Sequence, residues 1–90
     1  MTSESKMILD RRTKSLFGED VTYILFVRDD GKATFHVTVE YCGDSATHTL
    51  GTSFFESAKI FDAIEQGLVT PCALADVIED LQYLSATCGK

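Results

Sequence analysis

Two stretches rich in β-branched and aromatic residues, 21–28 and 33–42, flank a short Asp-Gly turn. This pattern predicts a β-hairpin. A three-residue loop over 29–31 pairs Leu25 with Phe35, Tyr23 with Val37 and Val21 with Val39. One face then collects the apolar side chains Val21, Tyr23, Leu25, Val27, Phe35, Val37, Val39 and Tyr41. A two-residue loop would divide these side chains between the faces, so burial favours the three-residue loop.

The opposite face of this hairpin is mostly polar, but it also carries large apolar residues. Ile24 and Phe26 lie there beside His36 in the predicted register. Apolar groups exposed among polar ones often mark an interface. Ile24, Phe26 and His36 therefore form one candidate interaction face, unless a further element of the chain covers them.

The second half of the chain predicts one more strand and two helices. Residues 46–50 alternate weakly after a Gly-Asp-Ser turn, which indicates a third antiparallel strand. Ser53 and Glu56 have the spacing of a capping box, and the helix that they begin continues to about Gln66, before Gly67. Thr70 and Pro71 indicate a second helix start. The helical apolar stripes are Phe54, Ala58, Ile60, Phe61, Ile64 and Leu68, then Leu74, Val77, Ile78, Leu81, Leu84 and Cys88.

The first eighteen residues show no clear periodicity. A helix over 5–17 that stops at Gly18, or a frayed segment that carries such a helix, fits slightly better than a short strand around Met7, Ile8 and Leu9. The predicted fold class is therefore α+β. A small antiparallel three-stranded sheet carries two C-terminal helices on one face, and residues 1–90 form a single domain whose residues 1–18 are loosely packed.

Composition changes this picture little. The chain has 90 residues, 44% of them hydrophobic and 24% charged, which is ordinary for a small globular domain. No apolar run is long enough for a transmembrane helix or a signal peptide. The three cysteines, Cys42, Cys72 and Cys88, are odd in number and far apart, which favours reduced thiols in a cytoplasmic protein.

The charge of −6 is unevenly distributed along the chain. Residues 1–39 hold equal numbers of acids and bases, so the whole net charge lies in residues 40–90. Asp76, Glu79 and Asp80 are spaced by three and four residues, which places them on one ridge of the last helix, opposite its apolar stripe. This acidic ridge, with Tyr83 and Phe55 as apolar anchors, is the predicted contact surface for a protein partner that has a basic surface. A solvated surface that keeps the protein soluble is the simpler interpretation.

Two other classes of function stay open. An enzyme or ligand-binding domain would use Cys72, placed at a helix start that favours the thiolate, or a pocket over the sheet. No nearby motif supplies a base or an oxyanion site. A nucleic-acid binder would use the basic segment of Lys6, Arg11, Arg12 and Lys14, but the acidic helices would repel a phosphate backbone.

We therefore expect a small non-enzymatic interaction domain that binds and modulates a protein partner, as an inhibitor or a nucleic-acid mimic in one version. The same features fit a subunit, an adaptor or a homodimer. We expect no cofactor and no membrane contact. A metal site of His36, Cys42 and His48 lacks the close ligand spacing of known sites, so we expect none.

Overall fold

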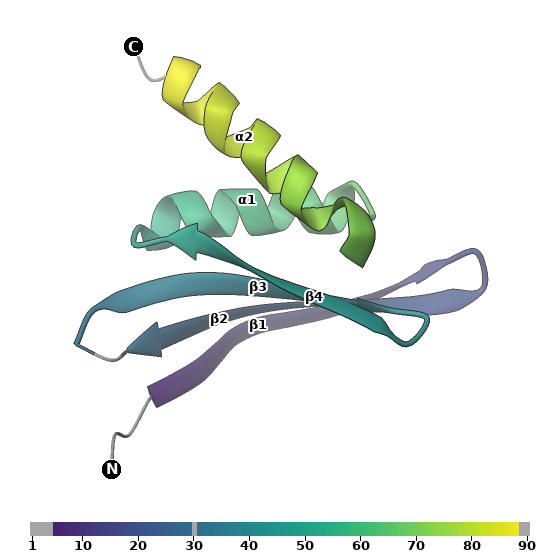
Figure 1. Cartoon of the computed structure of the whole chain (residues 1–90). Helices are drawn as coiled ribbons and strands as arrows, with labels where there is room; N and C mark the ends of the chain where they lie inside the picture. Colours follow the sequence, from purple (N-terminus) through teal and green to yellow (C-terminus); the bar gives the residue numbers. More distant parts are fainter. Residues whose placement is uncertain (1–4, 30, 89–90) are drawn as a thin grey trace.

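A computed structural model describes the backbone of residues 5–29 and 31–88, and the side chains of residues 6–29 and 31–82. The chain forms four strands followed by two helices, as Figure 1 shows. The elements are β1 (Ser5–Leu16), β2 (Glu19–Asp29), β3 (Ala33–Tyr41), β4 (Asp44–Gly51), α1 (Phe54–Gln66), a short 3₁₀ turn (Pro71–Ala73) and α2 (Leu74–Cys88). The predicted α+β class and the two C-terminal helices are confirmed.

The sheet has four strands, so the predicted count of three is wrong. Its order is β1-β2-β3-β4, with every neighbouring pair antiparallel. The missing strand is β1, in the segment where we favoured a helix. It pairs with β2 from Ser5–Asp29 to Leu16–Glu19, with a bulge between Ile8 and Asp10. Gly18 does not stop a helix but completes a two-residue turn with Phe17, and both residues have positive φ.

The predicted faces of the β2–β3 hairpin are confirmed, but the predicted residue pairs are wrong. Each residue of β2 lies opposite a β3 residue two positions later than predicted. Leu25 lies opposite Val37 and Tyr23 opposite Val39. The closing pair is Asp29–Ala33, so the three-residue loop lies one position later than predicted. A shift of two residues keeps every side chain on its face, which is why the burial argument gave the faces but not the pairing.

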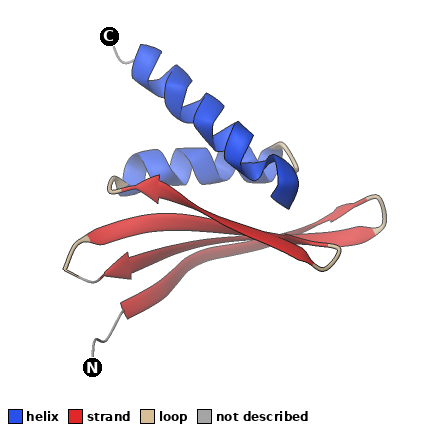
Figure 2. Cartoon of the chain, in the orientation of Figure 1, coloured by secondary structure: helices blue, strands red, loops and turns tan. Residues whose placement is uncertain are grey.

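Both helices cover the same face of the sheet, here called the inner face (Figure 2). The core between the layers consists of buried side chains from the strands and from one stripe of each helix: Val21, Tyr23, Leu25, Val37, Val39, Leu50, Ile60, Phe61, Ile64, Leu74 and Ile78. Most members of the predicted helical stripes are in this core or pack against it. Phe54, which is 56% exposed, is an exception, and the side chains of Leu84 and Cys88 lie outside the described residues.

The predicted start of α1 is confirmed, since the Ser53 hydroxyl accepts a hydrogen bond from the Glu56 amide at 3.3 Å. α1 also ends before Gly67 as predicted. The left-handed residue after it is Leu68, with φ 53°, and Gly67 stays in the helical region. The last helix begins at Leu74, after the 3₁₀ turn, and not at Pro71. Neither helix in the described part of the chain is long and apolar enough to cross a membrane.

Ion pairs tie β1 to α1. Arg12 of β1 contacts Asp62 at 2.8 Å and Glu65 at 2.9 Å, and Lys14 contacts Glu65 at 2.8 Å. The guanidinium also lies 5.0 Å from the centre of the Phe61 ring. Basic residues of the N-terminal segment therefore neutralise acidic residues of the second half of the chain. The uneven charge distribution along the sequence is thus partly balanced in the folded protein.

Candidate interaction surfaces

The predicted acidic ridge lies on the first half of α2. Asp76, Glu79 and Asp80 are exposed, whereas Ile78 between them is buried in the core. No carboxylate of this ridge forms an ion pair within the part of the chain that the structure describes. The ridge therefore presents negative charge that internal bases do not neutralise.

The predicted apolar anchors of this ridge are placed elsewhere or lie outside the description. Phe55 is 70% exposed in the first turn of α1, where the Lys59 ammonium lies 5.3 Å from its ring centre. α2 begins near the opposite end of α1 (Figure 1), so Phe55 is not brought beside Asp76. The side chain of Tyr83 lies outside the described residues.

The candidate residues on the other side of the sheet do lie together. The face without helices, here called the outer face, holds the ring of Phe26 stacked on that of His36, with ring centres 5.2 Å apart. Ile24 lies two residues before Phe26, on the same face of β2, and is half-buried. The adjacent strand β1 adds Ile8, which pairs with Phe26 and is 55% exposed. Ile8 could not be assigned to this face from the sequence because β1 was not predicted as a long strand.

Polar and basic groups surround this aromatic pair. The Lys6 ammonium lies 4.5 Å and the Arg28 guanidinium 5.8 Å from the centre of the Phe26 ring, and Phe26 is 2% exposed. Threonine hydroxyls contact both ring nitrogens of His36, Thr34 at 2.9 Å and Thr49 at 3.1 Å. These contacts fix the orientation of the imidazole. Ile8 is an exposed apolar side chain on the same face.

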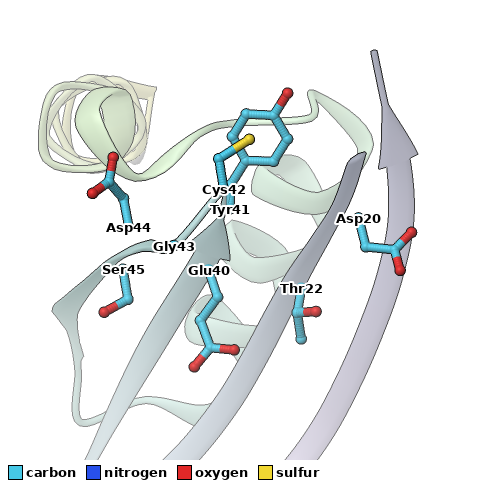
Figure 3. A pocket seen from close by; sticks show the side chains of 8 residues that line it. All are labelled: Asp20, Thr22, Glu40, Tyr41, Cys42, Gly43, Asp44 and Ser45. Atoms are coloured by element: carbon cyan, nitrogen blue, oxygen red, sulfur yellow. The ribbon is translucent and has the colours of Figure 1, made fainter. Parts of the chain in front are cut away.

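A shallow depression of about 370 Å³ lies where the β3–β4 turn meets β2. It is lined by Asp20, Thr22, Glu40, Tyr41, Cys42, Gly43, Asp44 and Ser45. In Figure 3 the carboxylates of Asp20, Glu40 and Asp44 point in different directions instead of toward one point. Within the described residues, no group of three or more His, Cys, Asp and Glu side chains is placed to hold a metal ion. His36 and His48 are on opposite faces, since His36 pairs with Thr49 and His48 with Val37.

The tyrosine of this depression is protected from ionisation. Burial raises the pKa of Tyr41, and the hydrogen bond with the Cys42 side chain and the charge of Glu19 raise it further. The Tyr41 hydroxyl donates to the Leu16 carbonyl at 3.1 Å. This contact joins the two hairpin turns at this end of the sheet, which is a structural role.

Cys72, the candidate nucleophile, is exposed and lies in the 3₁₀ turn instead of the first turn of an α-helix. Its sulfur lies 3.8 Å from the Thr70 hydroxyl. Both histidines lie on strands of the sheet, and no described contact of the Cys72 thiol is with a base. The described contacts therefore do not support a catalytic role for Cys72.

Phe17 is an exposed aromatic residue that sequence reasoning missed. It is 91% exposed at the tip of the β1–β2 hairpin, with φ 54°. The available signal was the Phe17-Gly18 dipeptide, because an X-Gly pair at this position is typical of a two-residue hairpin turn.

Comparison with known proteins does not change this description. No family model matches the chain, and neither a curated protein nor a solved structure matches it.

Proposed function

We propose that this chain is a non-enzymatic interaction domain that binds a protein partner through the acidic ridge of α2. The observation that carries the proposal is that Asp76, Glu79 and Asp80 are exposed without an internal ion pair in the described residues. By contrast, Arg12 and Lys14 are engaged by α1. Exposed charge of one sign attracts a partner of the opposite sign and accelerates its association. The proposed partner therefore has a basic surface, such as one that otherwise contacts nucleic acid.

The engagement of Arg12 and Lys14 also bears on the nucleic-acid alternative. Both bases lie on the inner face of β1 and contact Glu65. A phosphate backbone would have to displace these contacts to reach them. This observation favours a basic protein over a nucleic acid as the partner. We further propose that the protein acts in the cytoplasm, which localisation of the tagged chain in its native cell would test.

The experiment is quantitative affinity capture from native cell extract with the full chain as bait. The double variant Asp76→Lys with Glu79→Lys is compared with the control Asp20→Lys with Glu40→Lys. Both variants change two exposed acids and give the same net charge. We expect basic proteins captured by the wild type to be lost with the ridge variant, retained by the control, and released as salt is raised, because salt screens exposed charges.

We expect both variants to stay folded, since surface changes of this kind lower the free energy of unfolding by no more than about 0.5 kcal/mol each. Circular dichroism and thermal melts check this. A captured partner whose binding ignores both the ridge substitutions and salt would exclude the ridge as the contact surface.

A further inference from the structure

The two edges of the sheet differ in how they are protected against pairing with another strand. Natural edge strands carry charges, prolines or bulges that prevent such pairing. Each edge strand has one bulge, β1 between Ile8 and Asp10 and β4 at Leu50, so the bulges do not distinguish the two edges. β1 also carries basic residues along its length. The other edge strand, β4, has no Lys, Arg, Asp, Glu or Pro between Ser45 and Leu50. The Gln82 side chain of α2 donates to the Leu50 carbonyl at 3.2 Å, so the uncharged and uncovered part of this edge is 45–49.

The register of β4 identifies the backbone groups that are free for pairing. Tyr41 and Asp44 close a two-residue turn as a hydrogen-bonded pair, and such pairs alternate along an antiparallel ladder. The backbone groups of Ser45, Thr47 and Thr49 therefore point away from β3. The His48 Nδ1 donates to the Thr49 carbonyl at 3.0 Å, which occupies that outer acceptor. The free groups are thus concentrated at Ser45 and Thr47.

We propose that β4 pairs with β4 of a second copy of this chain. The pairing is antiparallel about a two-fold axis at Ala46, so that Ser45 lies opposite the partner's Thr47. Each such pair exchanges both of its backbone hydrogen bonds. Asp44 then lies opposite the partner's His48, which places a carboxylate against an imidazole on both sides of the axis. The sheet becomes one continuous eight-stranded sheet, with all helices on one face.

Three features of β4 favour this register and this occupant. A register centred on Thr47 would need the Thr49 carbonyl, which the His48 ring occupies. It would also lose the match of Asp44 with the partner's His48. Moreover, the two-fold axis meets β4 at Ala46, a small side chain that allows close approach. The strand is therefore complementary to itself, as an isologous dimer requires.

Edge pairing alone buries less surface than the roughly 1,200–2,000 Å² of a standard interface, so the dimer is expected to be weak. The test is sedimentation of the full chain from low micromolar to millimolar concentration. We expect the wild type to dimerise within this range. Thr47→Pro, which removes an outward N–H and blocks the edge, should weaken dimerisation at least tenfold.

Thr13→Pro is the matched control on the β1 edge. Its N–H also points outward by the same alternation, and both substitutions remove a cross-strand threonine hydrogen bond, Thr13 with Thr22 and Thr47 with Thr38. We expect Thr13→Pro to leave dimerisation unchanged. A wild type that stays monomeric throughout, or equal effects of the two prolines, would overturn the proposal.

A charge exchange tests the register without proline. Asp44→His alone places imidazole opposite imidazole and should weaken dimerisation, whereas Asp44→His with His48→Asp restores the match and should recover it. If the double variant fails to recover dimerisation, the register is wrong. None of these residues belongs to the acidic ridge, so this test and the capture experiment succeed or fail independently.

Discussion

At the scale of single residues, two hairpin turns use side chains that their backbone conformation disfavours. Phe17 and Cys42 have φ 54° and 52°, and each precedes a glycine with positive φ. Left-handed conformation is costly for residues other than glycine, asparagine and aspartate, and Asn-Gly is the preferred sequence of such turns. Phe17 recovers little of this cost by packing, since it is 91% exposed.

Replacement of Phe17 by Asn should therefore stabilise the protein. We expect the free energy of unfolding to rise by up to about 1 kcal/mol, because asparagine tolerates the left-handed region. Urea denaturation measures the change. Ser15→Asn is the control, since Ser15 has a normal backbone and should gain nothing. A loss of stability with Phe17→Asn would show that the phenyl ring makes a stabilising contact.

The buried Tyr23 hydroxyl gives a prediction for alkaline pH. Tyr23 is fully buried and donates to the Val69 carbonyl at 3.0 Å. Burial, with a contribution from the charge of Glu65, raises the pKa of Tyr23 from 10.0 to about 12. The unfolded chain therefore loses this proton at lower pH than the folded chain. The contribution of the protonated Tyr23 hydroxyl to stability is complete below pH 10 and is lost as pH rises through about 12.

Tyr23→Phe should remove this dependence. At neutral pH the variant loses about 1 kcal/mol with the hydrogen bond to Val69. Above pH 10 the wild type loses stability faster than the variant, so the difference between their unfolding free energies should shrink. Chemical denaturation at increasing pH measures this difference. A constant difference would mean that Tyr23 titrates normally.

At the scale of elements, the faces of β2 and β3 follow from alternation alone. The clearest test is a pair of neighbouring positions on β3. Val37→Asp places an unpaired carboxylate in the core, at a position with no exposure, and should cost several kcal/mol or prevent folding. Thr38→Asp changes the outer face and loses the contact with Thr47, at a cost of about 1 kcal/mol. Thermal melts of the two variants make the comparison. Equal tolerance of both would contradict the assigned faces.

β1 is the element that could not be predicted, and the reason is electrostatic. Its inner-facing positions include Asp10, Arg12 and Lys14, so no apolar alternation marks the strand. Their partners on α1, Asp62 and Glu65, lie about fifty residues further along the chain. Contacts with Lys14 and Arg12 keep the pKa of Glu65 low despite its burial. Periodicity identifies elements that bury apolar groups, and it misses one that is fixed by ion pairs and by pairing with its neighbour.

For the candidate surfaces, the sequence could show which residues share a face but not what packs over it. The spacing of Asp76, Glu79 and Asp80 predicted an exposed ridge, and these residues are exposed. It could not show how far Phe55, in the first turn of α1, lies from this ridge, because that separation depends on how the two helices pack. The contact between Phe26 and His36 depended on the register, and their stacking agrees with the predicted faces.

At the scale of the whole molecule, the two candidate surfaces lie on opposite sides of the sheet. The helices cover the inner face (Figure 1), and the stack of Phe26 on His36 is on the outer face. A partner held by the ridge on α2 would therefore leave the outer face accessible. This separation allows the two surfaces to be tested independently in one folded protein.

The expected outcome is that outer-face substitutions leave ridge binding intact. Ile8→Glu changes an exposed apolar side chain of the outer face without opening the core, because Ile8 is 55% exposed. Its affinity for a captured partner should stay within about twofold of the wild type, since well-separated sites act independently. Asp76→Lys with Glu79→Lys should abolish the same interaction. Titration calorimetry with the purified partner measures both. The reverse result, in which Ile8→Glu abolishes binding and the ridge variant does not, would assign the partner to the face that holds Ile24, Phe26 and His36.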